Sequence, residues 1–189
     1  MSRMTLSDFE ARYQADTDPW GYTTSAYEQR KYAATLAACG PGPFAHALEL
    51  GASIGVFTAA LLPRCQSLTT LDAAPTAVAR ARQRLGRAAG VQINEGKIPE
   101  AIPAGPYDLV VASEILYYLT AGELAATLDR LRERTVSAAR VVAVHWRPDG
   151  PERPLSADAV HETLRQQPWL RSVESDDTVD YRLDVLERR

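Results

Sequence analysis

A run of small and acidic residues indicates a ligand-binding turn, Glu49-Leu50-Gly51-Ala52-Ser53-Ile54-Gly55. Gly51 and Gly55 remove side chains where a backbone must approach a ligand, and Ala52 and Ser53 keep that surface low. Asp72 follows twenty-one residues after Gly51. An acid at about this spacing ends the next strand, where it can accept hydrogen bonds from both hydroxyls of a ribose. The spacing therefore predicts a nucleoside-binding site.

Nicotinamide dinucleotides and S-adenosylmethionine both carry such a ribose. The dinucleotide fingerprint G-x-G-x-x-G requires glycine at the third and sixth positions counted from Gly51, which here are Ser53 and Val56. Glu49 would place a carboxylate at the end of a strand, beside the turn. A carboxylate repels a diphosphate and suits the cationic sulfonium and ammonium groups of S-adenosylmethionine. The charges therefore favour the methyl donor over a dinucleotide.

The elements that must position this turn alternate between strand and helix signals. Strands are predicted at 45–50, 68–72, 91–93, 109–112, 141–144, 170–173 and 181–185, the last as a half-buried antiparallel strand. Helices are predicted at 25–39 and 54–62, from Pro75, from Thr120, and at 156–167. This order predicts an α/β fold, with a seven-stranded, mostly parallel sheet and an antiparallel C-terminal strand. Ligands bind beyond the carboxyl ends of strands in such a sheet.

Three segments have the spacing of a helix-initiating capping box: Ser7 with Glu10, Ser25 with Glu28, and Thr120 with Glu123. The first two begin helices ahead of the alternating region. We expect this N-terminal region, with Trp20 and Arg30, to fold over the cofactor as a lid. The chain is thus predicted to be one domain, 1–189, with a helical lid at 1–43, a cofactor-binding core at 44–146, and a closing helix and strands at 147–189.

Composition excludes several classes of protein. The chain has 189 residues, of which 46% are hydrophobic and 24% charged, and its net charge is −3. A mildly acidic chain offers no basic surface for nucleic acid or an anionic membrane. We expect a cytoplasmic protein, because no apolar run of about 20 residues occurs and the first residues lack a signal-peptide pattern. Cys39 and Cys65 are predicted to be reduced thiols, and no metal site is expected.

Glu49-Leu50-Gly51-x-x-x-Gly55 with Asp72 resembles the first two motifs of class I S-adenosylmethionine-dependent methyltransferases. Further stretches resemble the nodulation protein S (NodS-like) family over residues 18–146: Asp18-Pro19-Trp20, Ser25-x-Tyr27-Glu28, and Tyr107-Asp108-Leu109-Val110-Val111-Ala112-Ser113-Glu114-Ile115-Leu116-Tyr117-Tyr118-Leu119. The resemblance implies a Rossmann-like class I methyltransferase fold. It also implies S-adenosylmethionine as the cofactor, S-adenosylhomocysteine as its product, and N-methylation of a deacetylated amino sugar in a chitooligosaccharide.

Three positions depart from the pattern of the family. Ser53 replaces a glycine common in class I enzymes, which is tolerable if its φ is negative. Lys97 stands where the family often has an acid that accepts from the adenine amino group, and lysine cannot accept. Adenine would then bind backbone groups at Lys97 and Ile98 and pack on Ile98. Ser137-Ala138-Ala139 replaces the usual glycine-containing turn before the fifth strand.

The acceptor side is predicted from the strand ends. Glu114 and His145 follow the fourth and fifth strands, so both are candidates for the base that binds an ammonium and accepts its proton. Tyr117 and Tyr118 are expected to wall the acceptor site. The remaining residues are predicted to bind the cofactor: Trp20, Arg30, Glu49, Gly51, Ala52, Ser53, Gly55, Asp72, Ala73, Lys97, Ile98 and Ser113.

The predicted function is S-adenosylmethionine-dependent methyl transfer to an amino sugar or another small amine. Three alternatives stay open: O-methylation of a small metabolite, a non-catalytic subunit that binds S-adenosylmethionine, and an NAD-dependent oxidoreductase. The predicted partner is a small-molecule acceptor, and the sequence does not distinguish a monomer from a dimer.

Overall fold

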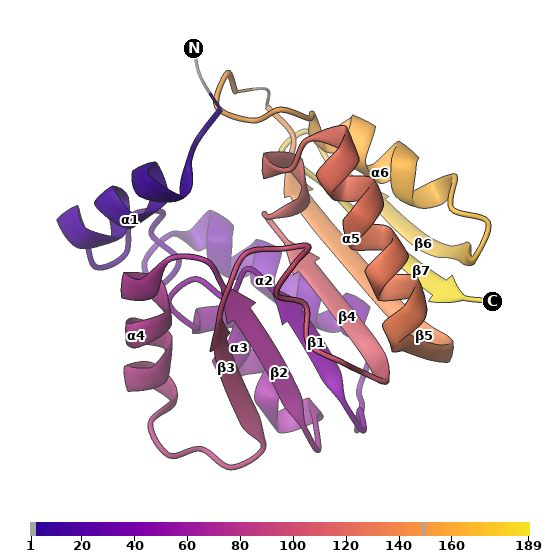
Figure 1. The fold of residues 1–189 in the computed structure, drawn as a ribbon, viewed down its shortest axis with the longest axis horizontal. Helices are drawn as coiled ribbons and strands as arrows, with labels where there is room; N and C mark the ends of the chain where they lie inside the picture. The colour runs from indigo at the N-terminus through magenta and orange to yellow at the C-terminus, as the bar shows by residue number, and fades with distance from the viewer. Residues whose placement is uncertain (1–2, 149) are drawn as a thin grey trace.

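The computed structural model describes residues 3–148 and 150–189 of the chain, which form a central sheet of seven strands. The strand order is β3-β2-β1-β4-β5-β7-β6 (Figure 1). The strands are β1 (Ala47–Leu50), β2 (Leu68–Asp72), β3 (Val91–Glu95), β4 (Tyr107–Ser113), β5 (Thr135–Trp146), β6 (Leu170–Asp177) and β7 (Tyr181–Arg188). The order reverses at β1 and β4, so the sheet has a switch point at its centre.

Helices cover both faces of the sheet (Figure 1). The α-helices are α1 (Leu6–Ala15), α2 (Ala26–Cys39), α3 (Val56–Leu61), α4 (Pro75–Leu85), α5 (Ala121–Arg134) and α6 (Ala157–Arg165). Two 3₁₀ turns, η1 (Leu62–Arg64) and η2 (Leu116–Tyr118), follow α3 and β4. Helices α5 and α6 lie on one face, and α2 and α3 lie on the other (Figure 1).

The predicted fold class is confirmed, but one strand is more deeply placed than its pattern indicates. Strand β7 pairs antiparallel with β5 on one side and with β6 on the other, while β1 to β5 pair in parallel. The prediction that the last strand is half-buried is wrong, because Arg182 to Leu186 are all buried. The charged side chains of Arg182 and Asp184 are buried in ion pairs. Charged and apolar residues therefore alternate in the sequence of a strand that is covered on both faces.

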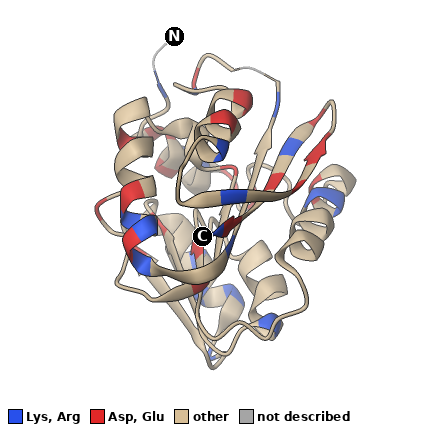
Figure 2. Ribbon diagram, turned by 90° about the vertical axis from the view of Figure 1, so that its right-hand side faces the viewer, with Lys and Arg blue, Asp and Glu red and all other residues tan. Residues whose placement is uncertain are grey.

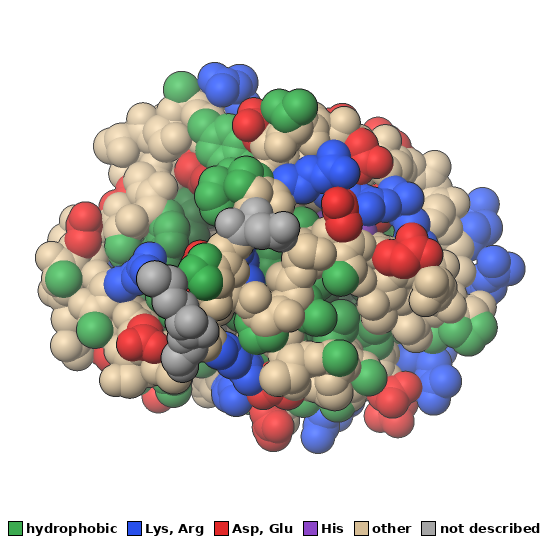
Figure 3. Space-filling model, turned by 90° about the horizontal axis from the view of Figure 1, so that it is seen from above, with side chains coloured by type: hydrophobic (Ala, Val, Ile, Leu, Met, Phe, Trp, Pro, Cys, Tyr) green, Lys and Arg blue, Asp and Glu red, His purple; other side chains and the backbone are tan. Residues whose placement is uncertain are grey.

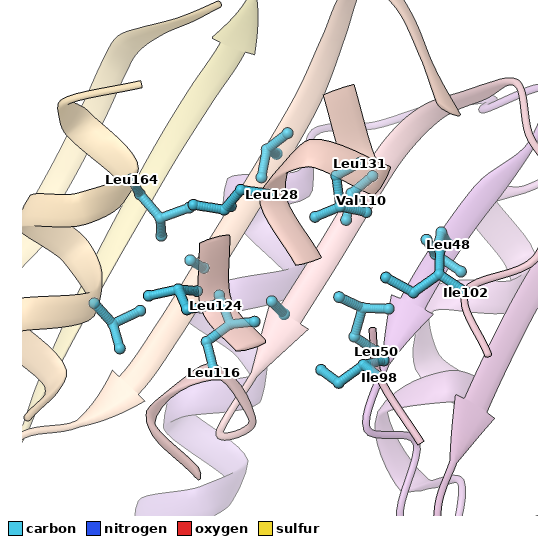
Figure 4. Packing of buried hydrophobic residues seen from close by; sticks show 14 of the residues in the cluster. Leu48, Leu50, Ile98, Ile102, Val110, Leu116, Leu124, Leu128, Leu131 and Leu164 are labelled. Atoms are coloured by element: carbon cyan, nitrogen blue, oxygen red, sulfur yellow. The ribbon is translucent and has the colours of Figure 1, made fainter. Parts of the chain in front are cut away.

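Two apolar clusters hold the sheet between its helices. On one face, Leu48, Leu50 and Val110 of the sheet pack against Leu124 and Leu128 of α5 (Figure 4). On the other face, α2 and α3 bury Cys39, Phe57 and Leu61 against β1, β4 and β5. Burial of this kind stabilises the fold by roughly 25 cal/mol per Å² of apolar surface removed from water. The two clusters fix the strand ends that carry the site.

Two of the three predicted N-caps are correct, but only one of the three predicted capping boxes is complete. Thr120 and Glu123 bond to each other's backbone N–H at the start of α5, as predicted. The Ser7 box is wrong, because Thr5 is the N-cap of α1 and its partner is Asp8. Ser25 caps α2, but the Glu28 side chain does not complete that box and turns elsewhere.

The segment that replaces the expected turn before the fifth strand is itself part of β5. Strand β5 runs from Thr135 to Trp146, and its register against β4 shifts between Thr135 and Arg140. Ala138 has a φ of 61° within this shift. A β-bulge therefore occupies the position at which the family pattern has a glycine-containing turn.

In the ribbon of Figure 2, Lys and Arg residues are interspersed with Asp and Glu residues along the helices and strands. Within the described residues, none of the helices combines the length and apolar character that crossing a membrane requires. The same residues include no group of three or more His, Cys, Asp or Glu side chains placed to hold a metal ion.

Candidate functional site

A cavity of about 470 Å³ lies at the carboxyl ends of β1, β2 and β4. Its size is within the range of small-molecule sites, about 300–1,000 Å³. Helix α1 and the segment before α2 form its outer wall. Viewed onto this end of the molecule, hydrophobic side chains gather around a hollow, with charged side chains at its margin (Figure 3). The cavity occupies the position expected of a ligand site at a topological switch point.

Asp72 ends β2 and lines this cavity. Its carboxylate accepts hydrogen bonds from the backbone N–H of Ser53 at 2.8 Å and of Ala74 at 2.9 Å. Burial raises the pKa of Asp72, and those backbone donors oppose the rise. The side chain is therefore held at a fixed position, with lone pairs directed to the cavity edge where the sequence predicts ribose hydroxyls.

Ser53 adopts a left-handed conformation, with φ 49°, so the expectation of a negative φ is wrong. Its backbone N–H bonds Asp72, and its hydroxyl accepts a 2.6 Å hydrogen bond from Tyr13 of α1. A non-glycine residue with this φ stores strain that its surroundings must offset. The two hydrogen bonds and the cavity position make Ser53 part of the site.

The two glycines of the turn serve different purposes. Gly51 has φ 76° and lines the cavity, and a Cβ there would lie 3.1 Å from Ile115. Gly55 has φ 78°, but a Cβ there would lie 3.1 Å from the backbone of Ala81 in α4. Gly55 does not line the cavity, so its role is close packing of α3 on α4 rather than the predicted approach to a ligand.

The Glu49 side chain does not reach the cavity. It is 3% exposed and accepts a 2.7 Å hydrogen bond from the hydroxyl of Thr58 in α3. Burial raises the pKa of Glu49 to about 7, although the hydrogen bond from Thr58 acts to lower it. The predicted placement of Glu49 beside the ligand is therefore wrong, and other groups must supply negative charge to the site.

Glu114, directly after β4, supplies such a charge at the cavity wall. Its Oε1 accepts from the Nζ of Lys31 at 2.8 Å and from the backbone N–H of Trp146 at 2.9 Å. Its Oε2 accepts from the Tyr117 hydroxyl and, at 3.1 Å, from the same backbone N–H. Its φ is 55°. Strained backbone and saturated hydrogen bonding are typical of a preorganised site.

Lys31 and Glu28 of α2 join Glu114 at this wall, and the sequence reasoning assigned neither to the site. Lys31 is 2% exposed, and its Nζ lies 3.0 Å from Oε1 of Glu28 and 5.1 Å from the ring centre of Tyr27. Two features of the sequence could have identified them. Glu28 and Lys31 share one turn of a predicted helix, and lysine is rare in this chain. The cluster carries two carboxylates and one ammonium.

His145 lies beneath the cavity wall rather than on its rim. It is fully buried, and its Nε2 accepts the backbone N–H of Leu116 at 3.1 Å. Its Nδ1 is 3.0 Å from His161 Nε2, and His161 Nδ1 is 2.8 Å from Asp184. Burial lowers the pKa of His145 well below its usual range. The predicted rim placement of His145 is therefore wrong; this buried chain instead positions η2, which carries Tyr117.

Aromatic rings form the outer side of the cavity. Trp20 contacts Phe9 and Tyr13, with ring centres 6.2 and 5.1 Å apart, and Phe9 meets Tyr118 edge-on at 4.9 Å. Tyr118 adjoins Tyr117 at 4.7 Å. These contacts link the N-terminal segment to η2 across the mouth of the cavity. Their faces exclude water from the space between them.

The structure brings most of the predicted site residues to the cavity: Trp20, Gly51, Ser53, Asp72, Ala73, Lys97, Ile98, Ser113, Glu114, Tyr117 and Tyr118. It does not bring Arg30, Glu49, Ala52, Gly55 or His145. Arg30 lies on the exposed side of α2, and Ala52 is buried with its N–H bonded to Leu71. The Lys97 side chain bonds Glu123 at 3.3 Å. Further lining residues include Arg3, Phe9, Arg12, Tyr13, Tyr22, Tyr27, Gly96, Trp146, Glu152 and Arg153.

The sequence of the chain is similar to one known family and to curated proteins of that family. The family model described as Nodulation protein S (NodS) matches residues 5–142. Nodulation protein S of Bradyrhizobium diazoefficiens is 39% identical over 109 residues, 57% of this chain and 52% of that protein. The Rhizobium tropici protein is 36% identical over 115 residues, 60% of this chain and 48% of that protein. The chain spans about half the length of the curated relatives it matches.

Solved structures extend the similarity over the whole fold. The N-methyltransferase NodS from Bradyrhizobium japonicum WM9, in complex with S-adenosyl-L-homocysteine, superposes with a TM-score of 0.87 at 25% identity. The match covers 98% of this chain and 99% of that one. A putative methyltransferase from Pseudomonas syringae has a TM-score of 0.77 at 34% identity, over 87% of this chain and all of that one.

Proposed function

Because the chain belongs to the nodulation protein S family, we propose that it is an S-adenosylmethionine-dependent methyltransferase that acts on the amine of an amino sugar or another small amine. The observation that carries this proposal is Asp72, a half-buried carboxylate held by two backbone N–H groups at the edge of a cavity beyond the strand ends. This arrangement suits a ribose. The SAH-bound NodS structure, which has the same fold, supports it.

The residues present fit the cofactor in three respects. Asp72 offers acceptors for ribose hydroxyls, and Gly51 and Ser53 leave a low backbone surface beside it. Ala73, Lys97 and Ile98 line the adjoining wall, where backbone groups and the Ile98 side chain suit adenine. Glu28 and Glu114 place negative charge at the cavity where the buried Glu49 does not. That charge suits a cationic ligand better than a diphosphate.

When bound, the cofactor supplies a methyl group on a positively charged sulfur. The chain's own residues have to hold an amine in line with that methyl group, and orientation of this kind contributes several kcal/mol to lowering the barrier. Tyr117 and Tyr118 wall the space next to Ser113, where an acceptor would enter. Trp20 and the rings around it exclude water. The carboxylates at the wall bind the ammonium form of the acceptor.

The aromatic and charged side chains of this wall also support an amino sugar as the acceptor. Trp146 is 39% exposed and lies beside Arg153, whose guanidinium carbon is 4.9 Å from the ring centre. A sugar has apolar ring faces that stack on such a ring and hydroxyls that bond carboxylates and guanidinium groups. We assign residues 1–43 the role of a lid, 44–146 that of the cofactor core, and 147–189 that of a closing unit.

Thermal unfolding with candidate ligands tests the cofactor assignment. A ligand that binds only the folded state raises its stability by RT ln(1 + [L]/Kd), about 2.7 kcal/mol at a hundredfold excess over Kd. S-adenosylhomocysteine is expected to raise Tm clearly, and NAD and NADP to leave it unchanged. The reverse pattern contradicts the proposal.

A panel of acceptors tests the reaction. Purified protein with S-adenosylmethionine is incubated with amino sugars, deacetylated chitooligosaccharides, small amines and hydroxyl-bearing analogues. The expected product is heavier by one CH₂ and carries it on nitrogen, as shown by mass spectrometry. Transfer to hydroxyl compounds alone would make the protein an O-methyltransferase. Binding of S-adenosylhomocysteine without turnover of any compound would make it a binding subunit.

A further inference from the structure

The start of α2 differs from the starts of α1 and α5 in one respect. Thr5 with Asp8, and Thr120 with Glu123, form complete capping boxes in which the acid returns to the backbone N–H of the cap. At α2 the N–H of Ser25 donates instead to Gly21 O at 2.7 Å. Glu28 is thereby released from the cap.

The released Glu28 side chain lies at the cavity wall, buried, and partnered by Lys31. Its Oε1 accepts from the Lys31 Nζ at 3.0 Å. Its Oε2 is buried and accepts no hydrogen bond from the residues that the structure describes, although Lys31 Nζ lies 3.0 Å from it. The described residues therefore offer this buried carboxylate a single ammonium, shared by its two oxygens, and part of its acceptor capacity remains without a donor. A ligand that donates a proton provides one.

Glu114, the other carboxylate on Lys31, is differently placed. Both its oxygens accept two hydrogen bonds, from Lys31, Tyr117 and the backbone of Trp146. Its lone pairs are therefore occupied by the protein, and it acts as a fixed counter-ion. Glu28 shares one ammonium between its two oxygens and so keeps acceptor capacity at the same cavity.

We propose that Glu28 is the residue that binds the acceptor's ammonium and takes its proton, with Lys31 as a positioning residue between it and Glu114; this rests on the methyl-transfer function proposed above. The proton moves from the ammonium nitrogen to Glu28 Oε2, which leaves the amine with a free electron pair. That pair forms the new bond from nitrogen to the methyl carbon, while the electrons of the methyl–sulfur bond stay on sulfur. The sulfonium becomes a neutral thioether, the product carries the positive charge, and the Glu28 proton returns to solvent.

The surroundings of Glu28 suit a proton acceptor. Burial raises its pKa, Lys31 on the same helix opposes the rise, and Glu114 after β4 and Asp18 before α2 add to it. The phenols of Tyr22, Tyr27 and Tyr32 face it from the N-terminal segment and from α2. A base whose pKa is raised toward the working pH is more effective in proton transfer.

The first test measures kcat against pH with glucosamine as the acceptor. In the parent, kcat is expected to fall on the acid side as Glu28 becomes protonated. Glu28→Gln is expected to lower kcat about a hundredfold or more and to remove that acid limb. Glu28→Asp restores part of the rate. Glu133→Gln, a glutamate on the exposed side of α5, is the matched control and keeps the parental rate and profile.

The second test is independent of the acceptor. Carbon-13 NMR of glutamate-labelled protein with S-adenosylhomocysteine is expected to show two carboxyls that titrate above the usual range of glutamate. One belongs to the buried Glu49 and disappears in Glu49→Gln, and the other disappears in Glu28→Gln. Parental kcat and profile in Glu28→Gln, or a parent in which Glu49 alone titrates above that range, overturns the assignment of Glu28. Loss of the S-adenosylhomocysteine thermal shift in Glu28→Gln also overturns it, since Glu28 would then belong to the cofactor site. The proposed function fails separately, if the parent itself shows no such shift.

Discussion

The hydroxyl of Tyr13 donates a 2.6 Å hydrogen bond to the hydroxyl of Ser53, forty residues further along the chain. Tyr13 lies on α1 and Ser53 in the turn between β1 and α3. Burial raises the pKa of Tyr13, so the phenol stays protonated and keeps the proton that it donates to Ser53. This bond fastens the N-terminal helix to the turn that carries the strained φ of Ser53.

Tyr13→Phe removes this hydroxyl and keeps the ring that contacts Trp20. A buried hydrogen bond contributes about 1 kcal/mol net, so the free energy of unfolding is expected to fall by about that amount. Urea denaturation measures it. Tyr181→Phe removes a hydroxyl that bonds Asp176 at the surface and is expected to change stability little. Equal effects in the two variants would show that the bond to Ser53 has no special role.

Asp72→Asn tests the ribose site while keeping the size of the side chain. A hydrogen bond to an ionised group contributes about 1.5–3 kcal/mol, against about 1 kcal/mol for a neutral pair. S-adenosylhomocysteine affinity is therefore expected to fall at least tenfold in calorimetric titration. Asp129→Asn on the exposed side of α5 is the control. Unchanged affinity in a folded Asp72→Asn protein would show that Asp72 only caps its strand.

Glu49 makes stability depend on pH. Its pKa is about 7 in the folded protein, above its value in the unfolded chain, so its contribution is fully present at low pH and is lost as pH rises. Between roughly pH 4.5 and 7 the folded state loses up to about 3 kcal/mol from this group. Glu49→Gln is expected to remove the loss, so that the difference in Tm between variant and parent grows from pH 5 to pH 8.

His145 acts in the opposite direction over a neighbouring range. Its pKa is depressed on folding, so its contribution is present above about pH 6.5 and declines below that value. The Glu49→Gln experiment cancels this term because both proteins contain His145. A constant difference in Tm at all pH values would contradict a raised pKa for Glu49.

His161→Ala breaks the buried chain from Leu116 to Asp184. It leaves a ring nitrogen of His145 without its partner and removes one of the two donors to Asp184 Oδ2, which still accepts from Arg165. The free energy of unfolding is expected to fall by about 3 kcal/mol. His46→Ala, which loses one contact with Thr69 at a half-buried position, is expected to cost about 1 kcal/mol. A smaller loss of unfolding free energy in His161→Ala than in His46→Ala would contradict a stabilising role for this series of hydrogen bonds.

The strand and helix order was predictable because each element carries its own periodic or capping signal. The Ala/Arg-rich segment after Pro75 and the box at Thr120 are local signals, and both helices begin where predicted. The depth of β7 was not predictable, because Arg182 and Asp184 are buried through ion pairs with residues distant in sequence. Charged residues in a strand indicate exposure unless their partners are known.

For the site, strand ends were a good guide and side-chain direction was not. Asp72 and Glu114 end strands and face the cavity, whereas Glu49 and His145 lie near strand ends with their side chains directed into the packed layers. A strand places alternate residues on opposite faces, so a shift of one position changes the surroundings entirely. On a helix, too, the sequence does not show which way a side chain points. Arg30 and Lys31 are adjacent on α2, yet Arg30 is exposed and Lys31 is only 2% exposed.

Helix α1 is attached to the rest of the protein by contacts from three separate elements. The N–H of Met4 bonds Glu152 O at 3.0 Å, Glu10 accepts the N–H of Thr76 at 3.1 Å, and Tyr13 bonds Ser53. Because α1 forms one wall of the cavity, the lid proposed for the N-terminal region would open for a reactant or a product only as these contacts separate. Loosening α1 would therefore speed product release and shorten the residence time of a bound ligand. Trp20 packs on Tyr13 of α1, so its intrinsic fluorescence would report the rate of that opening.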